Sequence, residues 1–145
     1  MATGVLLVAF LVAQMNARKY VPWIYWMTAV LLSIFGTLLT DNLVDGFGVA
    51  LQTTTIVFDV ALVATFAAWY ARERTLSIHT IITTRRELFY WAAILFTFAL
   101  GTAAGDFAAE GLQLGYATAA LIYGGLIAAI AAAYYGLNLN AIAAF

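Results

Sequence analysis

Apolar residues occur along this chain in long runs that are broken only by short polar segments. Four runs approach or exceed the roughly 20 residues that a helix needs to cross a membrane, and they cover 22–40, 49–70, 88–104 and 112–135. The run at 88–104 reaches that length only with its flanks. Pro22 falls in the first turn of its run, where a missing N–H does no harm. We therefore predict four membrane-spanning helices.

Shorter apolar segments lie near the two ends of the chain. Residues 3–14 form a partial first segment that lacks the basic leader and the clear cleavage site of a signal peptide. Residues 141–145 resemble the start of a further segment. We expect six segments in all, and a chain that is the central part of a longer protein.

When the sequence is aligned with itself at an offset of 65 residues, several rare residues match. Tyr25-Trp26 falls on Tyr90-Trp91, Gly36-Thr37 on Gly101-Thr102, Asp41 on Asp106, Asp45-Gly46 on Glu110-Gly111, and Tyr70 on Tyr135. Repeat one covers 20–70 and repeat two covers 85–135, with a loop at 71–86 between them. Both copies run in the same direction, so they are parallel repeats like those of some transporters. The predicted fold is all-α: one domain over 1–145, a polytopic membrane helix bundle of two parallel helical hairpins plus partial end segments.

Composition excludes several classes of protein. Apolar residues make up 66% of the chain and charged residues 9%, whereas a soluble domain is about 25% charged; a disordered chain is still less apolar. The absence of cysteine and the single histidine, His79, exclude disulfides, thiolate metal sites and multi-histidine metal or haem sites within one chain. Six basic residues against seven acidic ones suggest no nucleic-acid binding. No catalytic triad or phosphate-binding loop is present, so we expect no enzyme activity, no catalytic residue and no cofactor.

Charges are divided between the loops. Every basic residue lies in one of two loops: Arg18, Lys19, Arg72, Arg74, Arg85 and Arg86. The loops at 41–48 and 105–111 are acidic and contain no Lys or Arg. The positive-inside rule predicts that the basic loops are cytoplasmic and the acidic loops lie outside. The arginines could also contact anionic lipid, and His79 is expected to be solvated or to cap its loop. Aromatic residues at the cytoplasmic ends of the spans are expected to anchor in the headgroups: Trp23, Tyr25, Trp26, Tyr90 and Trp91.

Two long stretches carry a resemblance to a known family. They are RKYVPWIYWMTAVLLSIFGTLLTDNLVDGFGV and ERTLSIHTIITTRRELFYWAAILFTFALGTAAGD. They closely resemble the uncharacterised bacterial membrane-anchored proteins built from a repeated transmembrane domain of unknown function. The resemblance covers essentially the whole chain and implies a multi-pass protein of the bacterial cytoplasmic (inner) membrane. It also implies that this chain is the central part of a longer member, and it implies no activity.

Each repeat places a hydroxyl and two carboxyl groups at intervals of four residues. Thr37, Asp41 and Asp45 share one helix face, and the second copy repeats this set with Thr102, Asp106 and Glu110. Two packed hairpins would bring these oxygens together. Hard divalent cations prefer all-oxygen sites, and a carboxylate pair could equally hold a shared proton. The alternative is that these residues only end the helices at the water interface, as Asp-Gly turns often do.

Two further kinds of residue are candidates. Asp59 lies near the middle of its predicted span, where a charge costs at least about 2.5–3.5 kcal/mol, and is a functional candidate for that reason. The alternative is a neutral Asp59 that is hydrogen-bonded to Thr55 or to another helix. Small residues allow close helix packing in membranes, and the glycines expected to do so are Gly36, Gly101, Gly124 and Gly125.

Two functions remain open from the sequence. The first is a small transporter or exporter of a hard cation, or a proton-coupled carrier, that uses the paired repeat carboxylates. The second is a non-catalytic accessory subunit within a larger respiratory or photosynthetic membrane complex. The expected partners are the lipid bilayer, a divalent cation or proton, and either a second copy of the chain or neighbouring membrane subunits. Which metal, if any, binds is left open.

Overall fold

The computed structural model describes residues 2–17, 21–77, 81 and 83–144, and in that range it contains six α-helices. They are α1 (Ala2–Asn16), α2 (Pro22–Asp41), α3 (Leu51–Glu73), α4 (Thr84–Asp106), α5 (Tyr116–Gly136) and α6 (Ala141–Ala144). Helices α2 to α5 are long and apolar enough to cross a membrane. The predicted all-α fold with four spans is confirmed. Arg18, Lys19 and His79 lie outside the described residues.

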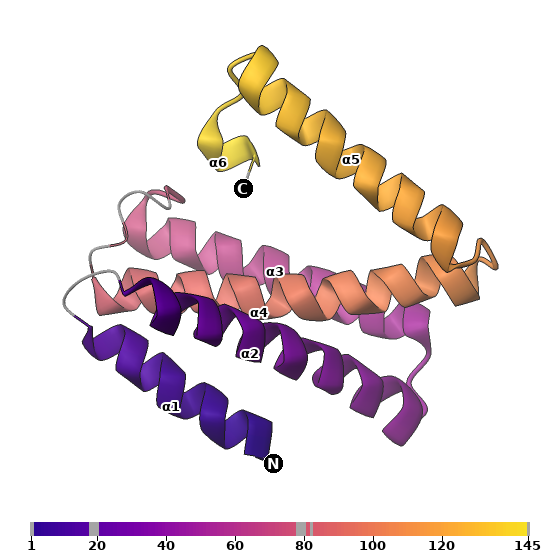
Figure 1. The fold of residues 1–145 in the computed structure, drawn as a ribbon, viewed down its shortest axis with the longest axis horizontal. Coiled ribbons are helices and arrows are strands. Elements are labelled where there is room, and N and C mark those ends of the chain that lie inside the picture. The colour runs from indigo at the N-terminus through magenta and orange to yellow at the C-terminus, as the bar shows by residue number, and fades with distance from the viewer. Residues whose placement is uncertain (1, 18–20, 78–80, 82, 145) are drawn as a thin grey trace.

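Four helices form a bundle (Figure 1). Helices α2 and α4 run parallel and side by side, α3 runs antiparallel against α4, and α1 packs on α2. We call the end at which α2 and α4 finish (41–48 and 105–111) the acidic end, and the opposite end, which carries Glu73, Arg85 and Arg86, the basic end. The core consists of two apolar clusters, one with Leu7, Leu32 and Trp91 and one with Phe58 and Ala99.

Helix α5 leaves this bundle at the acidic end (Figure 1). Its only buried residue is Ala119, and its Tyr123 hydroxyl donates a hydrogen bond to the Ala104 carbonyl of α4 at 3.0 Å. Apart from Ala133, which is half-buried, the other residues of α5 are exposed.

Equivalent residues of the two repeats meet each other between α2 and α4. The Tyr25 and Tyr90 hydroxyls lie 2.5 Å apart, and the Thr37 and Thr102 hydroxyls lie 3.2 Å apart. Both pairs join residues that are 65 positions apart in the sequence. The pairs are separated by about 18 Å along the helices, at 1.5 Å per residue. They define an approximate two-fold axis that runs along the α2–α4 contact, and the predicted parallel repeat is confirmed.

Gly36 allows α2 and α4 to approach closely. A Cβ at this position would lie 3.1 Å from both the Ala99 nitrogen and the Phe98 Cβ. One turn later the buried Thr40 hydroxyl lies 3.1 Å from the Ala99 carbonyl and 3.2 Å from the Gly36 carbonyl. The other predicted packing glycines behave differently: no atom lies within 4 Å of where a Cβ would stand at Gly101, Gly124 or Gly125. Their predicted packing role does not operate within the described part of this chain, because their faces meet no other helix.

Both repeats end their first helix in a short π-helical turn, which the sequence did not predict. These turns are η1 (Asn42–Gly46) and η3 (Phe107–Gly111). Each is closed by an i+5 backbone hydrogen bond, from Phe47 N–H to the Asn42 carbonyl at 3.0 Å and from Leu112 N–H to the Phe107 carbonyl at 2.9 Å. These bonds are repeat equivalents, so the copies share backbone geometry as well as sequence. Such turns are frequent at functional sites.

The aromatic residues at the basic end do not all face outward. Trp23 and Trp26 are exposed, as expected of headgroup anchors. The prediction is wrong for Trp91, which is only 4% exposed and packs in the core, because α1 and α2 cover its side of α4. Tyr25 is half-buried and packs on Trp91, with ring centroids 5.4 Å apart.

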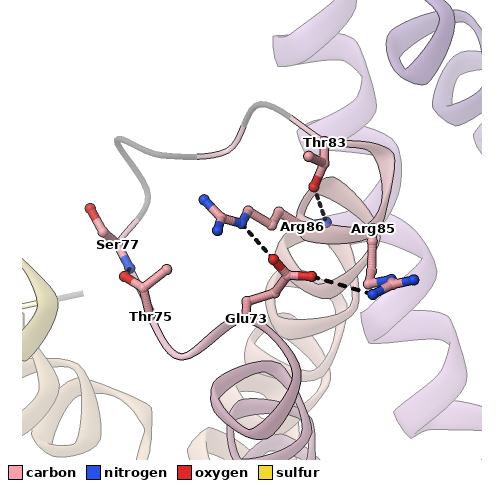
Figure 2. Close-up of polar contacts among 6 residues, drawn as sticks. All are labelled: Glu73, Thr75, Ser77, Thr83, Arg85 and Arg86. Atoms are coloured by element: carbon pink, nitrogen blue, oxygen red, sulfur yellow. Dashed lines mark hydrogen bonds and ion pairs between the residues drawn. The ribbon is translucent and has the colours of Figure 1, made fainter.

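An ion pair joins α3 to α4 at the basic end (Figure 2). Glu73 accepts a hydrogen bond from Arg86 Nε at 2.7 Å, and Arg85 Nη1 lies 3.9 Å from its other oxygen. The Thr83 hydroxyl accepts from Arg86 N–H at 3.3 Å and thereby caps the start of α4. This contact fixes the two ends of the loop between the repeats.

Candidate cation site at the acidic end

The two repeats bring four carboxyl groups to the acidic end of the bundle. Asp41 and Asp106 are the last residues of α2 and α4, one turn beyond the Thr37–Thr102 pair. Asp45 and Glu110 follow in the π turns η1 and η3. Because the helices are parallel and in register, each carboxyl group has its repeat equivalent on the other side of the approximate two-fold axis.

These groups line one cavity of about 260 Å³. Its lining also includes the first residues of α3 and α5, Leu51 and Tyr116. The full set is Thr40, Asp41, Val44, Asp45, Leu51, Asp106, Glu110 and Tyr116. Asp41 and Asp106 are half-buried, whereas Asp45 and Glu110 are exposed. The half-buried pair therefore forms the inner part of the site and the exposed pair its rim.

The site has an excess of negative charge. Asp106 is close enough to Asp41, Asp45 and Glu110 for their charges to interact, and none of the lining residues is basic. The Tyr116 hydroxyl donates a short hydrogen bond to Glu110 Oε1 and holds the rim of one repeat in place. Unless protons or a cation enter, these carboxylates repel one another.

The spacing of these groups suits a hydrated ion better than a bare one. Among the described residues, no three Asp, Glu or His side chains lie close enough together to ligate one metal ion directly. Six waters occupy about 180 Å³ at liquid density, so a cavity of about 260 Å³ has room for a divalent cation with its inner hydration shell. Magnesium-like cations give up their waters reluctantly and often bind proteins through them.

Other predicted residues lie outside the cavity. Thr37 and Thr102 bond to each other below it, and Thr102 also donates to the Phe98 carbonyl at 3.1 Å. Asp59 is on an exposed part of α3 and does not line the cavity. The hydrogen bond considered between Asp59 and Thr55 is not formed among the described residues, and the Thr55 hydroxyl donates instead to the Leu51 carbonyl at 2.8 Å.

Sequence reasoning missed Thr40 and Tyr116. Thr40 directly precedes Asp41, but its repeat counterpart is Gly105, so the repeat did not single it out. Tyr116 lies six residues after Glu110, across the turn into α5. No helical spacing links the two, and only the observed turn brings the phenol to the carboxylate.

The comparisons with known proteins agree with the internal repeat. The repeat of unknown function DUF347 matches residues 24–75 and 89–139, one copy in each hairpin. No curated protein and no solved structure matches the chain. The two matched stretches cover well over half of the sequence. The chain therefore belongs to the DUF347 repeat family and is a multi-pass membrane protein built from two copies of that repeat.

Proposed function

We propose that this protein is a small carrier for a hard divalent cation, or a proton-coupled carrier, with its site in the acidic-end cavity. The observation that supports this most is the pairing of Asp41 with Asp106 at the end of the α2–α4 contact, within one cavity. A purely structural helix end needs one capping group. It does not need four carboxylates gathered from two helices and their turns.

In this proposal the two carboxyl pairs have different tasks. Asp45 and Glu110, at the exposed rim, attract the hydrated cation. Asp41 and Asp106 hold its waters inside, and when the cation leaves they take up protons in its place. Exchange of a cation for protons at one carboxylate pair is the simplest form of coupling that the site allows. By the positive-inside rule the cavity faces the outside of the bacterial inner membrane.

The test is Mn²⁺ binding and flux with purified protein reconstituted in liposomes. Asp41→Asn and Asp106→Asn each remove one charge while they keep the side-chain shape. We expect each to weaken Mn²⁺ binding at least about tenfold, a loss of about 1.4 kcal/mol, and to abolish Mn²⁺ flux.

The matched control is Glu87→Gln, which removes a carboxylate at the basic end. Its oxygen accepts a hydrogen bond from Trp91 Nε1 at 3.3 Å, and the amide can still accept that bond. Glu87→Gln should bind Mn²⁺ like the original protein. If Asp41→Asn and Asp106→Asn do so too, the acidic-end cavity is not the site.

The second candidate is an accessory subunit that packs beside other membrane helices. One observation favours it, namely that α5 is almost entirely exposed although it is apolar enough to span a membrane. Mass determination after mild extraction separates the two proposals. Foreign subunits in fixed stoichiometry would support the accessory role, and this chain alone would support the carrier.

A further inference from the structure

Asp59 is an acidic residue without a partner inside an apolar helix. It lies eight residues after the start of α3, about 12 Å along a helix of 23 residues. Its side chain is exposed, and no hydrogen bond or ion pair to it is formed by the described residues. Lipid tails offer no hydrogen bond to a carboxyl group, and the cost of leaving it there is at least about 2.5–3.5 kcal/mol. A polar group from outside the described bundle must meet it.

Asp59 belongs to a stripe with the spacing of a helix–helix contact. The residues of the stripe follow one another along α3 at alternating intervals of four and three positions. They are Gln52, Ile56, Asp59, Val63, Phe66 and Tyr70. This is the heptad spacing of two helices that pack at a small angle. It extends over about 27 Å, close to the hydrocarbon thickness of a bilayer. All of the stripe is exposed except Phe66, which is half-buried.

We infer that a second copy of this chain docks along this stripe, with the two α3 helices parallel and in register. A two-fold axis along the membrane normal places Asp59 of each copy at the same depth. Their carboxyl groups then share a proton in one hydrogen bond, and the Gln52 amides pair one heptad away. The stripe thus satisfies its own polar groups without any other protein.

The molecule already uses this kind of contact internally. Helices α2 and α4 are parallel and related by an approximate two-fold axis, and their hydroxyl groups meet as equivalents at Tyr25–Tyr90 and Thr37–Thr102. A polar residue at a heptad contact position also fixes register and partner number in helix pairs. The second repeat has Gly124 in place of Asp59, so this surface is specific to α3.

Disulfide cross-linking in native membranes tests this inference, since the chain contains no cysteine of its own. Ile56→Cys and Val63→Cys lie on the stripe, and we expect each to form a covalent dimer of twice the chain mass on mild oxidation. The controls are Val57→Cys and Ala64→Cys, each one residue further and about 100° round the helix. Ile56 and Val57 are matched in depth and exposure, at 56% and 53%, so only the stripe distinguishes them.

Two results would overturn the inference. One is equal cross-linking at stripe and control positions, or none at the stripe; the other is capture of a different protein at Ile56→Cys. The carboxyl contact is tested separately by adding Asp59→Leu or Asp59→Asn to Val63→Cys. We expect the leucine to lower the cross-linked fraction several-fold and the asparagine, which still hydrogen-bonds, to retain it. Unchanged cross-linking with leucine would contradict the role of Asp59. None of these outcomes depends on cation transport.

Discussion

Gly36 and Gly101 occupy equivalent positions in the two repeats but differ in what surrounds them. Gly36 faces α4 at a distance that leaves no room for a side chain, whereas Gly101 is exposed and has no atom close to it. The difference arises because Gly36 lies on the face of α2 that packs against α4, whereas Gly101 lies on an exposed part of α4. The α2–α4 contact is therefore only approximately symmetric, because one of the two equivalent glycines takes part in it and the other lies on an exposed surface.

We predict that Gly36→Leu destabilises the protein and that Gly101→Leu does not. A side chain at position 36 must displace the α4 backbone at Ala99, and such overpacking costs about 1–3 kcal/mol. At position 101 the same side chain meets open space, and replacing a helical glycine is neutral or slightly favourable. Unfolding by SDS titration of the purified variants measures both. Equal loss of stability in the two variants would mean that α2 and α4 do not approach at Gly36.

At the residue scale, the sequence gives the types of group at the site but not their neighbours. Asp41, Asp45, Asp106 and Glu110 could be singled out because acidic residues are rare here and recur at a fixed offset. Trp91 could not be separated from Trp26 in this way, since the two are repeat equivalents. Trp91 is buried because it packs in a core cluster with residues of α1 and α2, whereas Trp26 is exposed.

At the scale of elements, the connection between the repeats depends on a single acidic residue. Glu73 ends α3, and its side chain is only 13% exposed while it contacts both Arg85 and Arg86 (Figure 2). The closer partner, Arg86, is itself mostly buried, whereas Arg85 is largely exposed. The two arginines are therefore unequal although they are adjacent.

We predict that Arg86→Gln lowers the free energy of unfolding by about 1 kcal/mol and that Arg85→Gln lowers it by less than about 0.5 kcal/mol. A short, partly buried ion pair is stronger than an exposed one that water and salt screen. SDS titration at low and high salt measures the difference. If the two variants lose the same stability, the geometry at Glu73 does not govern this connection.

The long helices could be predicted from apolar run length alone, because a span is a local property of the sequence. The ends of those helices could not. Residues 42–46 and 107–111 continue the helices as π turns, which depend on a one-residue change in hydrogen-bond partner that no residue type specifies. Those turns position Asp45 and Glu110. The residues of the site could therefore be predicted from the sequence, but their arrangement in space could not.

At the scale of the whole molecule, charge and topology agree. The ends of α2 and α4 lie at one end of the bundle, and the end of α3 and the start of α4, which carry Glu73, Arg85 and Arg86, lie at the other (Figure 1). A bundle with all of its described basic residues at one end has a defined orientation in a membrane.

We predict that the two ends are accessible from opposite sides of the membrane. In intact spheroplasts, a membrane-impermeant maleimide should label Phe47→Cys, whose side chain is 79% exposed at the acidic end. Thr84→Cys, exposed at the basic end, should react only after the membrane is permeabilised. The reverse pattern would place the carboxylate cavity in the cytoplasm and reverse the direction of the proposed carrier.

The hydroxyl pairs along the α2–α4 axis also bear on the origin of the protein. A residue that meets its own counterpart, as Tyr25 meets Tyr90, is what a single hairpin produces when two separate molecules of it associate. An ancestral gene for one hairpin could thus have made this contact as a homodimer before duplication joined the copies. Once joined, each copy was free to diverge. Asp59 and Gly124 are one difference of this kind, since one repeat has an acid where the other has no side chain.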